Sequence, residues 1–242
     1  MNGPGVLQGQ VAIVTGAGRG IGHAIARALA REGATVVLAA RNRQQLAATA
    51  AAVRESGGSA LAIPTDVTQD AAVEAMVEQT IAEQGRLDIL VTAAGVASFG
   101  PVSGTKPADW DGMLAVNLRA VMVTCRAALP IMIRQRRGTI INVASVAAQR
   151  PIPGSAVYTA TKAAIVGFSR VLAEELRSEK VRVGVLVPGA VDTPLWDTIP
   201  NSPDRGRMLR PDDVARAAVL MASMPEGAAL EELTLLPQGG IL

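Results

Sequence analysis

The chain has 242 residues, 49% of them hydrophobic but only 2% aromatic, and its formal net charge at pH 7 is +2. A nearly balanced charge with so few aromatic residues argues against nucleic-acid binding, which requires a clustered basic face and stacking side chains. The single cysteine, Cys125, excludes an internal disulfide, and the single histidine, His23, excludes a histidine-based metal site, so no metal is expected.

Neither of these rare side chains is expected to have a chemical role. Cys125 lies in a run of helical periodicity and is predicted to be an inert small hydrophobe, and His23 is predicted to face solvent. The N-terminus, Met1-Asn-Gly-Pro-Gly, lacks the charged and apolar regions of a secretory signal, and no uncharged apolar run approaches the length of a membrane span. These features predict a soluble, cytoplasmic protein with no membrane partner.

Short apolar runs alternate with stretches of helical periodicity along the chain. The runs that predict strands cover residues 11–15, 35–39, 60–63, 87–91, 139–143, 181–187 and 233–236. Helices are predicted over roughly 20–32, 43–56, 69–84, 108–135, 155–178 and 211–223. Buried strands joined by helices predict an α/β protein with a doubly wound, mostly parallel seven-stranded sheet and helices on both faces. One domain, residues 1–242, is expected, with no separate substrate domain.

The first predicted strand leads into a glycine-rich loop, Thr15-Gly-Ala-Gly-Arg-Gly-Ile-Gly22, and then into a helix. Glycines let the backbone turn tightly and approach a pyrophosphate, and a helix N-terminus offers free amides and positive potential. Glycines alone are weak evidence, but at the first strand-to-helix turn they indicate a dinucleotide site. The spacing is wider than in the usual fingerprint, and the loop lacks the lysine of a nucleotide-triphosphate loop.

The second predicted strand ends without the Asp or Glu that usually binds the ribose 2′-hydroxyl of NAD. Instead, Arg41 offers a guanidinium group suited to a 2′-phosphate, and so do Arg43 and Arg19. The alternative is that they are solvent-exposed residues of an arginine-rich chain. The missing acid favours NADP(H), with NAD(H) still possible.

The only tyrosine, Tyr158, lies four residues before Lys162, one of three lysines, and thirteen residues after Ser145. Four residues apart on a helix, the two side chains share a face. An ammonium beside a phenol favours the phenolate and lowers the pKa of the phenol, which suits a general acid/base. For an isolated Tyr-x-x-x-Lys, a stacking tyrosine and a solvated lysine are the commoner interpretation.

In combination, these motifs resemble the single-domain form of the short-chain dehydrogenase/reductase family, which has a Rossmann-type fold. The resemblance runs from about Gln10 to the end of the chain. It rests on the glycine loop, Asp66-Val67, Asn117, the spacing of Ser145, Tyr158 and Lys162, and Pro188-Gly-Ala-Val-Asp-Thr193.

The resemblance implies a catalytic tetrad. Tyr158 would donate a proton to the carbonyl oxygen as hydride arrives, and Ser145 would hydrogen-bond the same oxygen. Lys162 would lower the pKa of the tyrosine and hold the nicotinamide ribose, while Asn117 would position a water that relays protons to the lysine. The cofactor-binding residues that the resemblance implies are Gly16, Arg19, Gly20, Ile21, Gly22, Arg41, Asp66, Val67, Ala93, Gly95, Tyr158, Lys162, Pro188, Gly189, Val191 and Thr193.

The sequence departs from the family pattern in three places. The family's Asn-Asn-Ala-Gly is Thr92-Ala-Ala-Gly95 here, which leaves backbone contacts to the cofactor but no asparagine side chain. The C-terminal Pro237-Gln-Gly-Gly240 lacks the Asp that many members carry. The segment Thr193–Pro211 is shorter than the substrate lid of typical β-ketoacyl-carrier-protein reductases, which suggests a more open site or a smaller substrate.

The predicted function is an NADPH-dependent carbonyl reductase that interconverts a ketone or 3-oxo group and a secondary alcohol. One alternative is a 3-oxoacyl-carrier-protein reductase, whose acidic carrier would dock on Arg134, Arg136 and Arg137, although Glu179 works against a continuous patch. Another is a small 3-hydroxy acid dehydrogenase. A non-catalytic dinucleotide sensor is disfavoured because the serine, tyrosine and lysine are intact. The resemblance also implies a homo-oligomer, a tetramer or dimer.

Overall fold

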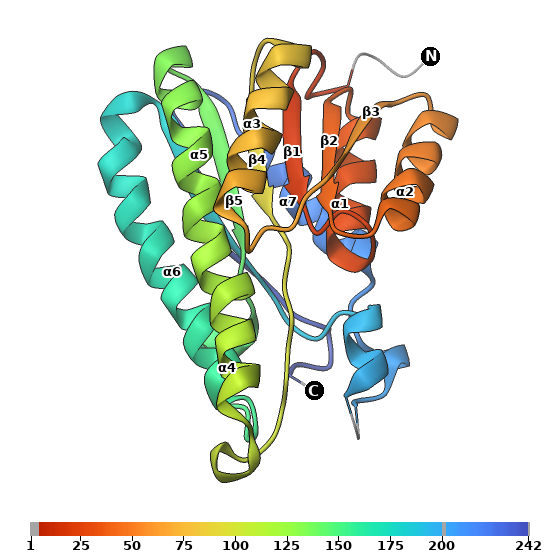
Figure 1. The fold of residues 1–242 in the computed structure, drawn as a ribbon, viewed down its shortest axis with the longest axis vertical. Helices are drawn as coiled ribbons and strands as arrows, with labels where there is room; N and C mark the ends of the chain where they lie inside the picture. The colour runs from red at the N-terminus through yellow and green to blue at the C-terminus, as the bar shows by residue number, and fades with distance from the viewer. Residues whose placement is uncertain (1–4, 200–201, 242) are drawn as a thin grey trace.

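Within residues 5–199 and 202–241, the part of the chain that the computed structural model describes, seven parallel strands form one sheet (Figure 1). Their order is β3-β2-β1-β4-β5-β6-β7, which confirms the predicted doubly wound sheet. Chain order reverses between β1 and β4, and ligands of open α/β sheets bind in the crevice at such a point, outside the carboxyl ends of the strands. The strands are β1 (Val11–Thr15), β2 (Thr35–Ala40), β3 (Ser59–Pro64), β4 (Ile89–Thr92), β5 (Gly138–Val143), β6 (Val181–Pro188) and β7 (Glu232–Leu235).

Helices cover both faces of this sheet (Figure 1). One layer contains α1 (Gly20–Arg31), α2 (Arg43–Glu55) and α7 (Pro211–Ala222), and the other contains α3 (Asp70–Gln84), α5 (Ala120–Gln135) and α6 (Ala156–Leu176). Successive residues of a strand face opposite layers, so in β1 Val14 packs in the first core and Ile13 in the second. Strands buried on both sides explain the unbroken apolar runs in the sequence.

The strand predicted over 87–91 begins two residues before β4, which starts at Ile89. The buried carboxylate of Asp88 explains this difference. Asp88 is 2% exposed, and its side chain accepts a hydrogen bond of 2.9 Å from the amide of Val11 at the start of β1. Arg86 donates two further hydrogen bonds of 2.7 Å to the same carboxylate. Asp88 therefore ties β1 and β4 together by its side chain at the amino edge of the sheet.

The predicted helix 108–135 is one helical stretch with an irregular centre. It consists of α4 (Pro107–Leu114), a π-helical turn at Ala115–Arg119, and α5. By length and composition the whole stretch could cross a membrane, but one such helix is weak evidence because the core helix of a soluble protein passes the same test; 44% of its most apolar window is buried within the protein. Helices with a π turn carry an extra residue per turn, and such turns are common at functional sites.

The prediction that His23 faces solvent is wrong. Its ring lies half-buried between α1 and α2, where Nδ1 is 2.8 Å from the hydroxyl of Thr49. Burial, followed by the charge of Arg27, lowers the pKa of His23. Two predictions fall partly outside the described residues: the N-terminal segment at residues 1–4, and the substrate segment at residues 200 and 201.

Candidate active site

A cavity of about 120 Å³ opens at the carboxyl ends of β1, β4 and β5, where the chain order reverses. Nine of the residues predicted from the sequence line it: Arg19, Gly20, Ile21, Gly22, Ala93, Gly95, Tyr158, Lys162 and Thr193. They come from four separate segments of the chain. The fold thus brings the glycine loop and the tyrosine–lysine pair to one cavity.

The glycine loop is packed so closely that side chains are excluded from it. Gly16 has a φ of 70°, and a Cβ there would lie 2.8 Å from the backbone of Ala94. A Cβ on Gly22 would lie 2.4 Å from the carbonyl oxygen of Gly16. The side chain of Arg19, the residue before α1, does not cap the helix, so the first amides of α1 are available to an anion.

The turn after β6 closes the other side of the glycine loop. Gly189 donates to the carbonyl of Leu235 at 2.8 Å, and Val191 forms an isolated bridge with Leu209. These contacts place Thr193, which is 8% exposed, against the loop, with its methyl group 3.3 Å from the position of a Cβ on Gly20. The predicted nicotinamide-side turn therefore meets the predicted phosphate loop.

Tyr158 and Lys162 lie in the first two turns of α6, and Ser145 directly follows β5. The ammonium of Lys162 is 5.8 Å from the centre of the Tyr158 ring and donates to the carbonyl oxygen of Val143 at 2.9 Å. The Ser145 hydroxyl accepts a bond of 3.2 Å from the amide of Ala147. Lys162 is only 5% exposed and forms no salt bridge with a carboxylate of the described residues, so it is a buried cation without a counter-ion.

Burial shifts both titrating groups. It lowers the pKa of Lys162 from 10.5 to about 8, because desolvation disfavours the ammonium. It raises the pKa of Tyr158, and a hydrogen bond with the Ser145 hydroxyl acts in the opposite direction. The expected lowering of the phenol pKa by Lys162 does not prevail in this structure, where burial is the larger influence on the phenol and the lysine donates to a backbone carbonyl.

Asn117 is fully buried in the π turn between α4 and α5. Its Oδ1 accepts from the amide of Val96 at 2.9 Å, and its Nδ2 donates to the carbonyl of Val96 at 2.8 Å. A Cβ on Gly95 would lie 3.6 Å from this Oδ1 and 3.9 Å from the Lys162 ammonium nitrogen. Asn117 is thus held beside the lysine by the loop that follows β4.

Two buried hydroxyls, those of Thr92 and Thr15, form hydrogen bonds that hold the segment Thr92–Gly95, where the two asparagines of the family pattern are absent. Thr92 donates to Asn142 Oδ1 at 2.7 Å, and Asn142 Nδ2 donates to Ser169 at 2.8 Å. Thr15 accepts from the amides of Ala93 and Ala94 at 3.2 and 3.3 Å. The network around Asn142 was missed from the sequence, where an amide inside the apolar run 139–143 was the available signal.

The predicted adenine-side residues lie beyond the cavity, at the ends of β2 and β3. Asp66 accepts from the amide of Thr68 at 3.0 Å and from its hydroxyl at 2.8 Å. These bonds lower the pKa of Asp66, with a smaller contribution from the charge of Arg41. Arg41 is exposed just past β2, and Val67 is buried. The arginine and the carboxylate therefore share one neighbourhood.

Three of the chain's five aromatic residues gather at the catalytic tyrosine candidate. The ring centre of Phe99 lies 5.6 Å from that of Tyr158 and 6.0 Å from that of Trp196, on which it stacks at an interplanar angle of 7°. The Trp196 indole donates to the carbonyl of Val191 at 3.0 Å. Neither Phe99 nor Trp196 was singled out from the sequence, although their scarcity in this chain was a usable signal.

Two negative expectations concern groups away from the cavity. Cys125 is fully buried, and burial raises the pKa of its thiol to about 12, which confirms an unreactive cysteine. Among residues 5–199 and 202–241, no cluster of three or more His, Cys, Asp or Glu side chains could hold a metal ion.

Residues 10–204 match the model of a protein family described as short chain dehydrogenase. The chain is 37% identical over 232 residues to an uncharacterized oxidoreductase of Staphylococcus aureus strain MRSA252, with 96% of this chain and 99% of that protein covered. It is also 37% identical over 235 residues to an uncharacterized oxidoreductase of Staphylococcus saprophyticus, with 96% and 98% covered.

Two solved structures have the same fold over nearly the whole chain. A metagenomic short-chain oxidoreductase in complex with NADP superimposes with a TM-score of 0.85 at 39% identity, covering 96% of this chain and 99% of the other. An alcohol dehydrogenase from the archaeon Thermococcus sibiricus, complexed with 5-hydroxy-NADP, gives a TM-score of 0.86 at 33% identity, covering 93% and 95%.

Proposed function

The chain belongs to the short-chain dehydrogenase family and is an oxidoreductase with a nicotinamide dinucleotide site, and from that premise we propose that it is an NADPH-dependent carbonyl reductase. It would interconvert a ketone or 3-oxo group and a secondary alcohol. The observation that carries this proposal is the position of Tyr158 and Lys162 in the cavity that the glycine loop and Thr193 also line.

The bound nicotinamide would supply or accept the hydride, and the protein's own residues would move the proton. Tyr158 would protonate the carbonyl oxygen, or deprotonate the alcohol in the reverse direction. Ser145 would donate a hydrogen bond to the same oxygen as charge develops on it. Lys162 would hold the ribose hydroxyls and carry protons onward with Asn117. Its lowered pKa, about 8, supports this role because the lysine can change protonation near neutral pH.

The residues of the glycine loop fit a dinucleotide pyrophosphate. A Cβ at Gly16 or Gly22 would collide with backbone, so the loop keeps its surface free of side chains. The remaining predicted cofactor residues, Pro188, Gly189 and Val191, would hold the nicotinamide end. Preference for NADPH is supported by the exposed Arg41 beside Asp66 and by the lack of an acid at the end of β2. The NADP and 5-hydroxy-NADP complexes of the two similar structures agree with this preference.

The substrate would be a small ketone with an apolar or aromatic substituent. The stacked pair of Phe99 and Trp196 supports this, because aromatic faces beside the catalytic phenol offer an apolar wall. The carrier-protein alternative is weakened because Arg136 pairs with Glu179 at 2.7 Å instead of facing a partner. A small 3-hydroxy acid is disfavoured by the same apolar wall.

A homo-oligomer in the cytoplasm, built from one domain per chain, completes the proposal. Large apolar side chains are exposed on the outer helices: Leu114 at 42%, Met122 at 43% and Val171 at 60%. Such side chains on neighbouring helices suit a contact between copies. Light scattering coupled to gel filtration would measure the assembly, and a monomer would contradict it.

The test of the activity is a panel of ketones and alcohols, each assayed with NADPH and NADH. We expect NADPH-dependent reduction of aryl and alkyl ketones and none by Tyr158→Phe. If purified protein binds NADPH but neither wild type nor any variant turns over any carbonyl or alcohol, the dinucleotide-sensor alternative replaces this proposal.

A further inference from the structure

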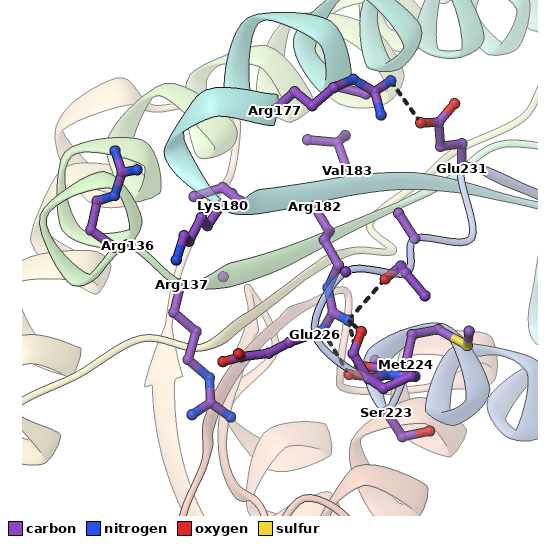
Figure 2. Close-up of a pocket in the computed structure, with 18 of the residues that line it drawn as sticks. Arg136, Arg137, Arg177, Lys180, Arg182, Val183, Ser223, Met224, Glu226 and Glu231 are labelled. Atoms are coloured by element: carbon purple, nitrogen blue, oxygen red, sulfur yellow. Dashed lines mark hydrogen bonds and ion pairs between the residues drawn. The ribbon is translucent and has the colours of Figure 1, made fainter.

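A second cavity, larger than the one at the active site, lies at the opposite edge of the sheet. It has a volume of about 810 Å³ and opens at the amino ends of β5 and β6, where the segment after α7 forms its other wall (Figure 2). Five cationic side chains line it, against two carboxylates, Glu226 and Glu231. The cations are Arg136, Arg137, Arg177, Lys180 and Arg182. We refer to this cavity as the basic cleft.

Carboxylates already neutralise two of these cations. Arg136 pairs with Glu179 at 2.7 Å, and Arg177 pairs with Glu174 and, at 3.0 Å, with Glu231. The other three, Arg137, Lys180 and Arg182, have no carboxylate of their own among the described residues. Arg137 comes within 4.0 Å of Asp88 only, and that carboxylate already binds Arg86 through two hydrogen bonds.

Arg182 is a fixed, half-buried positive charge at the back of the cleft. Its guanidinium donates to Thr139 Oγ1 at 2.8 and 3.1 Å and to backbone carbonyls of the segment 222–228, including that of Ala228 at 3.2 Å (Figure 2). Neutral acceptors satisfy its N–H groups but do not cancel its charge. Burial, and next the charge of Arg137, lower the pKa of Arg182, and the charge of Glu226 acts in the opposite direction.

Backbone strain points to the same place. Within the described residues only two non-glycine residues have positive φ, Arg136 at 53° and Lys180 at 58°, and both line the cleft. Each stands where a helix ends, in the left-handed conformation that glycine adopts at lower cost. A cation at a helix C-terminus interacts favourably with the helix dipole, but a residue in the last turn could supply that cation without a left-handed backbone conformation. Strained residues that carry a ligand-binding side chain are typical of functional sites.

We propose that the basic cleft binds a small polyanion, a metabolite that carries a diphosphate or two phosphate groups, through Arg137 and Lys180 in front of the fixed charge of Arg182. Arg137 and Lys180 supply the hydrogen-bond donors, since their side chains are exposed and unpaired by a carboxylate of their own. Three cations without a carboxylate of their own and a volume of about 810 Å³ suit a molecule larger and more charged than one phosphate ion. This site is separate from the glycine loop, which lies at the opposite edge of the same sheet.

The test is calorimetric titration with inorganic pyrophosphate at constant ionic strength, with and without saturating NADP⁺. We expect one binding event that NADP⁺ does not abolish, that inorganic phosphate reproduces at least tenfold more weakly, and that Arg137→Gln with Lys180→Gln weakens at least tenfold. Glu226→Gln should tighten it, because this acid faces the cleft. The matched control is Arg31→Gln with Arg126→Gln, which removes the same charge from exposed positions outside the cleft.

A second variant separates a binding role from a structural one. Lys180→Gly removes the donor but relieves the left-handed conformation, so the midpoint of thermal unfolding should hold or rise by up to about 4 °C while pyrophosphate affinity falls. Unchanged affinity in this variant or in the double variant would overturn the proposal. An equal loss in the control pair would do so too, because it would reduce the effect to general charge. The cleft variants report on this site even if NADP⁺ does not bind.

Discussion

Two buried charges at opposite edges of one sheet, Asp88 and Lys162, are held in opposite ways. At the amino edge, Asp88 is buried but accepts hydrogen bonds from the Val11 amide and from Arg86, so its charge fixes two strands in place. At the carboxyl edge, Lys162 is also buried, yet its ammonium donates to a neutral carbonyl. Removing the partner of a buried charge is destabilising, and a buried charge that has no partner is a cost that is typical of functional sites.

The largest expected effect tests the chemistry of the carboxyl edge. Tyr158→Phe removes the proton donor, so turnover should fall at least about a hundredfold where chemistry limits the rate. NADPH binding and the free energy of unfolding should change little, because the phenol hydroxyl is not part of the core. Steady-state kinetics and a fluorescence titration with NADPH measure both. More than about a tenth of the wild-type kcat in the variant would disprove the assigned role.

The amino edge should respond in the reverse manner. Asp88→Ala leaves the Val11 amide and the Arg86 guanidinium without their partner and should cost about 2–3 kcal/mol of unfolding free energy. At a temperature where the variant stays folded, kcat should remain within about twofold, since the active site lies at the other end of the strands. Urea unfolding and kinetics on the same sample measure this. A selective loss of kcat without loss of stability would break the contrast.

Cofactor preference tests the periphery of the carboxyl edge. Ala40→Asp with Arg41→Leu replaces an attraction to the 2′-phosphate with a repulsion and adds an acceptor for the free ribose hydroxyl. A charge-assisted hydrogen bond contributes roughly 1.5–3 kcal/mol, so NADPH affinity should fall about ten- to a hundredfold while NADH gains. Arg126→Leu, which removes an exposed arginine on α5 away from the cofactor residues, is the control. Equal use of NADH and NADPH by the wild type would contradict our interpretation of β2.

The free energy of unfolding of Lys162→Met tests whether the buried lysine destabilises the carboxyl edge. The displacement of the lysine pKa from 10.5 to about 8 corresponds to roughly 3 kcal/mol of lost stability at neutral pH. The methionine variant loses the hydrogen bond to the Val143 carbonyl. In the absence of cofactor, its free energy of unfolding at pH 7 should therefore exceed that of the wild type by about 1–2 kcal/mol. This variant should also lose turnover and bind NADPH more weakly.

The pH dependence of this gain follows from the direction of the shift. The folded-state pKa of Lys162 lies below the unfolded value, so the unfolded chain binds more protons between about pH 8 and pH 10.5. Wild-type stability relative to Lys162→Met should therefore rise over that window, and the gain of the variant should shrink. Urea midpoints at pH 7 and pH 9.5 measure it. A gain that stays constant with pH would show that the lysine is not buried as a cation.

Much of this molecule was predictable from local patterns. Apolar runs, helical periodicity and the glycine cluster predicted the seven strands, the main helices and the tight turn between β1 and α1, because strand burial and tight turns depend on nearby residues. The spacing of Tyr158 and Lys162 placed both on one helix face. Rare residues in a motif carry more information than common ones, so the single tyrosine of the chain was enough to indicate the candidate site.

Other features depend on groups that meet only after folding. The Phe99–Trp196 stack joins residues 97 positions apart, and the bond between Thr92 and Asn142 spans 50 positions, so no local pattern indicates either. The π turn that buries Asn117 and the desolvation of Lys162 arise from packing around them. The basic cleft gathers cations from three separate chain segments, of which only Arg136 and Arg137 were noticed in the sequence. Local sequence specifies backbone conformation, but burial and charge balance are properties of the assembled tertiary structure.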